Sequence, residues 1–315
     1  MKQAAVFPGQ GSQRVGIGKS LSEEFPVALD TFREADEILG RNLSKLMFEG
    51  PSDELSLTQN TQPALLAFSI AVLRVIESEI TQGSLIDKVT FVAGHSLGEY
   101  TALCAADAFS FADAIKLVEI RGKAMQNAVP VGQGSMAAIL GLDIDKLDTV
   151  IYEASKIGVC DFANDNAPGQ VVLSGSKAAI DFAVKLAKEK GAKRAIMLPV
   201  SAPFHSAMMQ PAGEIMREAL SNIEMRVPIV PVVSNVSVSP STDLSDIKNQ
   251  LVEQVCGRVR WRESILYMKS QGIDQIIEVG YGKVLTGMVR RIDQTLSAIN
   301  VGETDEIKIM VEKMS

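Results

Sequence analysis

The sequence predicts an α/β fold in which a mostly parallel sheet carries an inserted subdomain. Short apolar runs rich in β-branched residues alternate with long helical stretches, which is the pattern of a parallel sheet covered by helices. Between residues 131 and 200 the order becomes strand, helix, strand, strand, helix, strand, which is the ferredoxin-like order. With 315 residues and 46% hydrophobic composition, the chain can bury a large core.

The main sheet is expected to form a large subdomain from residues 1–130 and 197–315. Its strands should be short and apolar, because both faces of a parallel sheet are covered by helices. The runs that fit are Lys2 to Phe7, Val89 to Ala93, Ala195 to Val200, Ile229 to Ser234 and Gln275 to Val279.

The insertion is expected to form a small subdomain over residues 131–196. Its two ends meet the larger sheet, so we expect the cleft between the subdomains to hold the site. The predicted strands are 135–140, 158–163, 170–174 and 195–200, the predicted helices are 144–156 and 178–190, and a loop NDNAPG joins the middle strands.

Residues 90–100 predict a nucleophile elbow with Ser96 at the turn. The sequence GHSLG at 94–98 fits the pattern G-x-S-x-G, and an apolar run precedes it while an Ala/Leu-rich helical stretch follows. In that context Ser96 Oγ stands above the sheet, and the N–H of Leu97 lies at a helix N-terminus, where it can donate to an oxyanion. The alternative is a structural turn, since the five-residue pattern alone is loose.

The chain has only two histidines that could act as the base for a serine nucleophile. His95 adjoins Ser96 and is expected to point away from its hydroxyl, so we interpret it as a packing or orienting residue. His205 lies between the apolar run 195–200 and a helix that Ser206 could cap. That places it at the carboxyl end of a strand, where α/β active sites lie, so His205 is the candidate base.

Arg121 is predicted to lie on the apolar side of a helix. The helix begins after Ser110, with Asp113 completing a box-like start, and its charged residues gather on the opposite face. A buried guanidinium needs an anion or a route to the surface. Two interpretations stay open: a structural salt bridge to a protein carboxylate, or a bidentate clamp on a substrate carboxylate.

Two glycine-rich stretches suggest nucleotide binding but fit neither motif. A dinucleotide fingerprint would need glycine where Arg14 stands, and a P-loop would need glycine at Gln13. The turn at residues 9–11 can still offer the backbone N–H of Gln10 to a ligand as a second oxyanion donor. A tight turn without that role is the alternative.

Whole-chain properties exclude several classes of function. The net charge of −7, from 38 acidic and 31 basic residues, argues against nucleic-acid binding. No apolar run approaches the roughly 18 residues of a membrane span, and the N-terminus lacks a signal peptide's apolar region, so we expect a cytoplasmic protein with no membrane partner. The three cysteines, Cys104, Cys160 and Cys256, are far apart, so neither a disulfide framework nor a metal site is predicted.

Together, the motifs resemble those of malonyl-CoA:acyl carrier protein transacylases over essentially the whole chain. The matching segments, in order, are GQGSQ, TQPALLAFSIAVLRV, GHSLGEY, EIRGKAMQ, NAPGQVVLSG, PVSAPFHSAMM, VEQV followed by VRW, and EVGYGKVLTG. The resemblance implies an α/β-hydrolase-like large subdomain with an inserted ferredoxin-like small one. It also implies that a malonyl group moves from coenzyme A to the phosphopantetheine thiol of acyl carrier protein, through a malonyl-serine, in fatty acid biosynthesis.

The resemblance also implies roles for individual residues. Ser96 would be the nucleophile, His205 the base, Gln10 and Leu97 the oxyanion donors, and Arg121 the clamp on malonate. Gln254 would orient the histidine through its backbone carbonyl, a role that Asp takes in hydrolase triads. Asn166 would lie near the pocket, with Asn164 as a close neighbour. No cofactor is expected, because the coenzyme A thioester is the substrate, and a monomer is expected.

Two positions depart from the family pattern. Arg258 and Tyr281 stand where proline is usual, and we expect both in loops near the cleft. An acidic enzyme must dock an acidic carrier through local positive charge. The candidate cations are Lys190, Lys193 and Arg194, or Arg258, Arg260, Arg290 and Arg291.

Two other classes of protein would show some of the same features. A serine hydrolase would use Ser96 and His205 without needing Arg121, and a non-catalytic acyl- or carrier-binding protein would keep the fold without a reactive serine.

Overall fold

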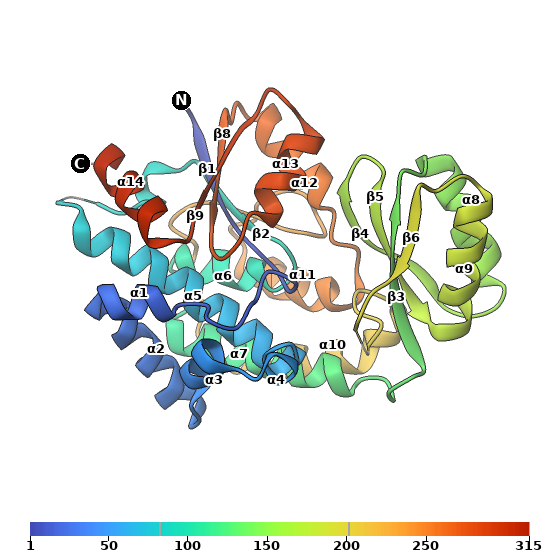
Figure 1. Cartoon of the computed structure of the whole chain (residues 1–315), viewed down its shortest axis with the longest axis horizontal. Helices are drawn as coiled ribbons and strands as arrows, with labels where there is room; N and C mark the ends of the chain where they lie inside the picture. The colour runs from blue at the N-terminus through green and yellow to red at the C-terminus, as the bar shows by residue number, and fades with distance from the viewer. Residues whose placement is uncertain (82, 201, 315) are drawn as a thin grey trace.

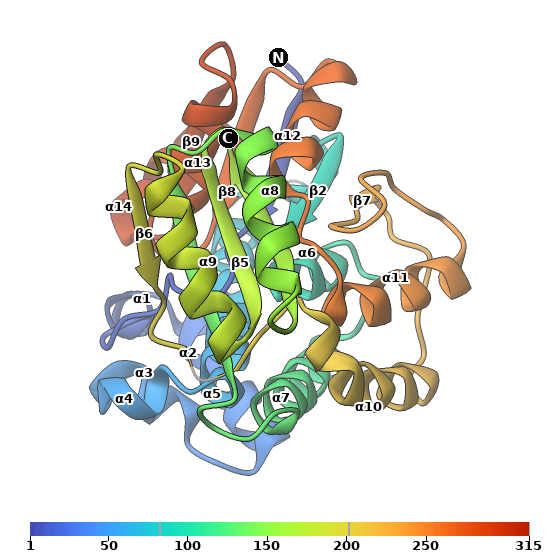
Figure 2. The ribbon, with the colours of Figure 1, turned by 90° about the vertical axis from the view of Figure 1, so that its right-hand side faces the viewer.

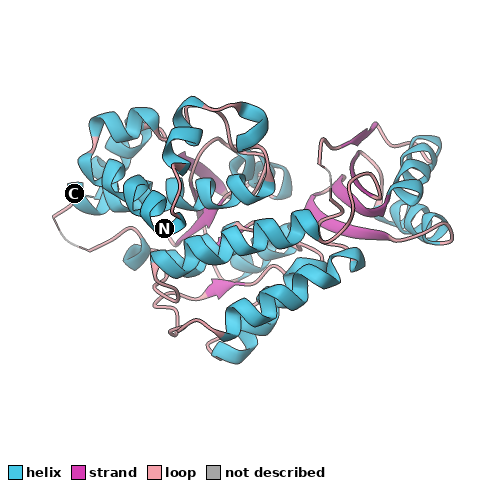
Figure 3. Ribbon diagram, turned by 90° about the horizontal axis from the view of Figure 1, so that it is seen from below, coloured by secondary structure: helices cyan, strands magenta, loops and turns pink. Residues whose placement is uncertain are grey.

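The computed structural model describes residues 1–81, 83–200 and 202–314, and its strands form a five-stranded and a four-stranded sheet. Figures 1 and 3 show the four-stranded sheet and its two helices as a separate lobe at one end of the molecule. The predicted class, an α/β fold with a ferredoxin-like insertion, is confirmed.

The large sheet is entirely parallel, with the strand order β7-β2-β1-β8-β9. The edge strand β9 was not predicted, because its sequence SAINV has few large apolar residues. The predicted strand at 229–234 shrinks to two residues, and the run 195–200 does not join this sheet. The strands are β1 (Gln3–Phe7), β2 (Phe91–Gly94), β7 (Val232–Val233), β8 (Gln275–Val279) and β9 (Ser297–Val301).

Helices cover both faces of this sheet. Ala5 and Phe7 of β1 face the core formed with α2, α5 and α7, whereas Ala4 and Val6 face Trp261 and its neighbours on α12 and α13. The helices of this part are α1 (Lys19–Glu24), α2 (Pro26–Leu39), α3 (Leu43–Glu49), α4 (Ser52–Leu55), α5 (Thr58–Glu79), η1 (Ile86–Lys88), α6 (Gly98–Ala105), α7 (Phe111–Asn127), η2 (Ala207–Met209), α10 (Gln210–Ser221), α11 (Leu244–Cys256), α12 (Trp261–Ser270), α13 (Val284–Ile292) and α14 (Thr304–Met314).

Helix α5 runs through the centre of the large subdomain. By length and composition it could cross a membrane, although 83% of an 18-residue stretch of it is buried inside the protein, as in the core helix of a soluble protein. Its unbroken apolar run is shorter than a membrane span, as predicted, because polar residues interrupt it. Its first turns bring Thr58 and Gln62 to the site.

The small sheet is antiparallel, with the ferredoxin-like order β4-β5-β3-β6. Helices α8 and α9 cover its outer face, as Figure 2 shows. Met136, Ala163 and Val172 on the other face belong to the core of the large subdomain. The elements are β3 (Gly134–Leu140), α8 (Ile144–Ser155), β4 (Cys160–Ala167), β5 (Gln170–Ser176), α9 (Lys177–Glu189) and β6 (Arg194–Met197).

Strand β4 is longer than predicted and is attached to the large subdomain. The expected loop from residue 164 is strand as far as Ala167, with irregular register against β5. Val259 pairs with this strand: its N–H donates to the Ala163 carbonyl at 2.8 Å, and its carbonyl accepts from the Asp165 N–H at 2.9 Å. This pairing places Asn164 and Asn166 at the cleft.

Candidate active site

Ser96 stands at a strained turn between β2 and α6. Its φ is +54°, in the left-handed region that non-glycine residues seldom occupy. A Cβ on Gly94 would overlap the backbone of Gly98, and a Cβ on Gly98 would overlap the Phe7 carbonyl. The two glycines therefore let the helix pack directly on the strand, as the elbow pattern predicts.

His205 faces this serine. Its Nε2 lies 2.8 Å from Ser96 Oγ, and its Nδ1 lies 2.8 Å from the backbone carbonyl of Gln254. Because a carbonyl only accepts, Nδ1 carries the proton and Nε2 is free to accept from the serine hydroxyl. Burial, followed by the nearby Arg121, lowers the pKa of His205 to about 3, which keeps the imidazole neutral.

The local setting of His205 differs from expectation in one detail. Ser206 does not cap the following helix, because its hydroxyl donates to the Pro203 carbonyl at 2.7 Å. The N–H of Ala207 instead donates to Asp161 of β4 at 2.8 Å. Within the motif PVSAPFHSAMM, Ser201 lies outside the described residues.

Gln10 and Leu97 both line the cavity into which Ser96 opens. Within the described part of the chain, neither backbone N–H has a hydrogen-bond partner. A Cβ on Gly9 would overlap the His95 carbonyl, so the glycine lets the first loop lie tightly against the elbow. The arrangement leaves two N–H donors available for an oxyanion.

Arg121 is 1% exposed and reaches the same serine. Its Nη2 donates to Ser96 Oγ at 3.1 Å and to Gln254 Oε1 at 2.8 Å, and its Nη1 donates to Gln62 Oε1 at 2.9 Å. A Cβ on Gly122 would overlap the backbone of α5, so this glycine allows α5 and α7 to approach closely. Among the described residues Arg121 forms no ion pair and its Nε has no partner, so the guanidinium remains available to an anion.

The sequence reasoning missed a buried polar network behind the serine. Glu99 Oε2 accepts from the backbone N–H of Asn235 at 3.0 Å and from Gln254 Nε2 at 2.8 Å. Asn235 in turn accepts from the Ser96 N–H at 2.8 Å and donates to the Gly94 carbonyl at 2.7 Å. Two signals could have found these residues: an acid in an apolar helix, and an amide at the carboxyl end of a predicted strand.

His95 packs beside the elbow, as expected. Its Nε2 lies 2.8 Å from Asn166 Oδ1, and its ring lies edge-on to Trp261 with centroids 5.6 Å apart. Burial lowers the pKa of His95. Asn166 and its neighbour Asn164 line the cavity, so β4 of the small sheet contacts the residue next to the serine.

A cavity of about 300 Å³ lies between the subdomains. Its apolar wall combines β3, β5 and α13, and includes Met136, Val172 and Met288. It opens onto the serine, the imidazole and the guanidinium together. It can therefore hold a small acyl group against all three.

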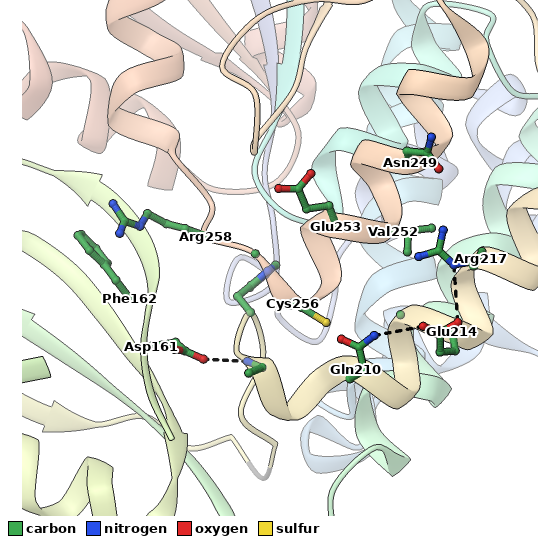
Figure 4. A pocket seen from close by; sticks show the side chains of 14 residues that line it. Asp161, Phe162, Gln210, Glu214, Arg217, Asn249, Val252, Glu253, Cys256 and Arg258 are labelled. Atoms are coloured by element: carbon green, nitrogen blue, oxygen red, sulfur yellow. Dashed lines mark hydrogen bonds and ion pairs between the residues drawn. The ribbon is translucent and has the colours of Figure 1, made fainter. Parts of the chain in front are cut away.

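A larger open groove of about 770 Å³ lies on the other side of His205, between β4 and helices α10 and α11 (Figure 4). Neither Ser96 nor Arg121 lines it, so we place the chemistry in the smaller cavity. Arg258, one of the two residues that depart from the family pattern, lies in this groove with its guanidinium 4.0 Å from the centroid of the Phe162 ring. Tyr281, the other, packs on Phe68 and does not line the acyl cavity.

Within residues 1–81, 83–200 and 202–314, no group of three or more His, Cys, Asp or Glu side chains could hold a metal ion. The three cysteines are free.

Fold and site together define an acyltransferase, and the family model of the acyl transferase domain matches residues 5–305. Within this class, the chain belongs to the malonyl CoA-acyl carrier protein transacylases, as the motifs indicated. It is 48% identical to the *Bacillus subtilis* protein of that name (99% of this chain, 97% of that protein). It is 45% identical to the *Escherichia coli* K12 protein of that name (98% of each).

Solved structures agree with this assignment. The acyl-carrier-protein-S-malonyltransferase of *Bartonella henselae* superposes with a TM-score of 0.96 at 51% identity, covering 100% of this chain and 99% of that one. A malonyl-transacylase in complex with a type II PKS acyl-carrier protein superposes with a TM-score of 0.95 at 43% identity, covering 99% and 100%.

Proposed function

We propose that the protein transfers a malonyl group from malonyl-CoA to the phosphopantetheine thiol of acyl carrier protein, by double displacement through a malonyl-serine. The observation that carries this proposal is the contact of Ser96 Oγ with both a neutral imidazole at 2.8 Å and a buried guanidinium at 3.1 Å. The names of the relatives support malonyl-CoA and the carrier as substrates.

The first half-reaction loads the serine. His205 Nε2 takes the hydroxyl proton while Ser96 Oγ attacks the thioester carbonyl, and the N–H groups of Leu97 and Gln10 stabilise the oxyanion. The Gln254 carbonyl accepts from Nδ1–H and holds the imidazolium in place. Collapse of the intermediate breaks the carbon–sulfur bond, and the imidazolium gives its proton to the leaving coenzyme A thiolate, which departs as the thiol.

The second half-reaction reverses these steps with the carrier thiol as nucleophile. Throughout, the Arg121 guanidinium binds the distal carboxylate of the malonyl group. The transfer takes its acid–base chemistry from His205, and no cofactor beyond the thioester is proposed. We propose that the protein acts as a monomer and that the reaction takes place in the cytoplasm.

The carrier is proposed to dock at the rim of the cavity near β6 and α13. Arg291 Nη1 donates at 3.0 Å to Oε1 of Gln170, which lines the cavity. The Gly141 N–H donates to the Gly169 carbonyl at 2.7 Å, and the Lys193 side chain packs at Gly141. Leu140 lies opposite both Arg194 and Gln170, so we infer that Lys193, Arg194 and Arg291 share one rim. Arg260 is paired with Glu263, and Arg258 lies in the other groove.

Incubation with radiolabelled malonyl-CoA tests the proposal. Without carrier, the label should remain on Ser96; with holo-carrier, it should move to the carrier thiol. Release of free malonate as the main product would identify a hydrolase instead. Failure to label the protein would identify a binding protein.

A further inference from the structure

One buried carboxylate beside the site has no part in this mechanism. Glu99 lies in the first turn of α6, three residues after the nucleophile, and is 3% exposed. Burying a charged carboxylate is unfavourable unless its partners compensate it. Its partners are therefore informative.

Gln254 connects this carboxylate to the guanidinium. Its Nε2 donates to Glu99 Oε2 at 2.8 Å, and its Oε1 accepts from Arg121 Nη2 at 2.8 Å. A side-chain amide donates at one end and accepts at the other, whereas a carboxylate only accepts and a guanidinium only donates. The two charged groups together thus permit a single orientation of the amide. A flipped amide would set NH₂ against the guanidinium and oxygen against the carboxylate.

The second arm of Glu99 leads to the elbow, which Gln254 also contacts because its Nε2 donates to the Ser96 carbonyl at 2.9 Å. Its Oε2 accepts from the Asn235 N–H, and the Asn235 side chain holds the backbone on both sides of the turn. This arm does not involve Arg121. A role restricted to it would affect every acyl substrate alike.

We propose that Glu99 is a positioning residue that controls acyl selectivity. It acts through the Gln254 amide, orienting the Arg121 guanidinium in the cavity and offsetting its positive charge. The inference rests on the proposed function, in which Arg121 binds the malonyl carboxylate. A thioester without that carboxylate does not depend on the guanidinium. Glu99 should therefore influence malonyl transfer much more than acetyl transfer.

Glu99→Gln tests this on the full chain, because it keeps the shape but removes the charge and the acceptor-only character. At about pH 8 we expect kcat/KM for malonyl-CoA to fall about 10- to 100-fold, as for a hydrogen bond to a charged group. With acetyl-CoA the fall should stay below about threefold. Equal falls for the two thioesters would overturn the proposal.

If circular dichroism shows that Glu99→Gln folds poorly, two further variants test the same proposal. Gln254→Met removes the amide but retains the backbone carbonyl that binds His205, and it should shift the malonyl-to-acetyl ratio in the same direction. An unchanged ratio in a folded Gln254→Met protein would overturn the proposal. In an Arg121→Ala background, adding Glu99→Gln should leave the ratio unchanged, and a further shift there would also overturn it.

Glu278→Gln is a matched control. Glu278 is also fully buried and accepts two backbone N–H groups, from Leu285 and Thr286, but it contacts neither Gln254 nor Arg121. Its substitution should affect both thioesters equally. Wild-type enzyme that fails to load malonate would refute the proposed function itself, whereas normal loading with equal losses in Glu99→Gln refutes only this inference.

Discussion

Asp165 of β4 and Arg262 of α12 form a bidentate ion pair across the boundary between the two subdomains. Arg262 Nη2 lies 2.7 Å from Asp165 Oδ2, and Nε lies 3.0 Å from Oδ1. The Asp165 side chain is 3% exposed and that of Arg262 is 32% exposed. Since Asn164 and Asn166 flank this aspartate and line the cavity, the pair fixes where the small sheet meets the elbow.

Substituting either residue of this pair should lower the stability of the protein, and the two losses should not be additive. We expect Arg262→Gln to cost about 1–3 kcal/mol in the free energy of unfolding, because a largely buried carboxylate loses its counter-charge. Asp165→Asn should cost a similar amount, because the guanidinium loses its charged acceptor. The double variant should cost less than the sum, by about 1–2 kcal/mol. Denaturant unfolding of the four proteins measures this, and strictly additive losses would contradict a direct interaction.

Ser96 and His205 should behave as one catalytic unit. Either alanine substitution removes the proton transfer, so each single variant should lose about as much of kcat as the double variant. Single-turnover loading of malonyl-CoA measures the loss. Near-normal transfer by Ser96→Ala would show that the nucleophile lies elsewhere.

Arg121→Ala should change which acyl group is preferred. Removing one partner of a desolvated charge pair costs ~2–5 kcal/mol, so kcat/KM for malonyl-CoA should fall roughly 30-fold to a few thousand-fold. Acetyl-CoA has no distal carboxylate and should lose far less. Lysine should rescue only partly, because a point charge cannot replace the planar fork. Equal losses for both thioesters would make Arg121 a structural residue.

The stability of the protein should depend on the charge of Glu99. Burial raises the pKa of Glu99 from 4.5 to about 7, so the folded state holds this proton more tightly than the unfolded state. The resulting stabilisation is fully present below pH 4.5 and is lost as the pH rises through about 7. The Tm of Glu99→Gln relative to wild type should therefore increase between about pH 5 and about pH 8. A difference that does not vary with pH would show that Glu99 titrates normally.

Charge reversal at the rim should weaken carrier binding. We expect Lys193→Glu combined with Arg194→Glu to raise the KM for acyl carrier protein about two- to tenfold and to reduce its salt dependence. Loading from malonyl-CoA should be unchanged. Lys185→Glu, on the exposed side of α9, is the control. A KM as low as that of the control would argue against this docking site.

Whether a feature could be predicted from the sequence depended on how far apart in the sequence the interacting residues are. The elbow and the helix of Arg121 follow local patterns, and the structure has both, with Ser110 accepting from the Asp113 N–H at 3.0 Å as the cap. The placement of His205 opposite Ser96 followed from the scarcity of histidines. The links of Glu99 to residues 235 and 254 join segments more than a hundred positions apart, and no local pattern reports them.

Similar reasons explain the errors in the fold. The sequence NDNAPG has the composition of a loop, yet most of it lies in β4 because Val259 supplies backbone partners from the other subdomain. The run 195–200 is apolar enough for either sheet. Only its pairing with β3, such as Ala137 opposite Met197, assigns it to the small one.

The small lobe joins the rest of the chain through two crossings that lie side by side. Strands β3 and β6, which begin and end the lobe, pair with each other, and a Cβ on Gly134 would overlap the ring of Pro203. Because its two ends are adjacent, the lobe can be replaced as one unit without changing the order of the parallel strands. The small sheet that covers the acyl cavity can thus change in sequence or length without changing the strand order of the sheet that carries the serine.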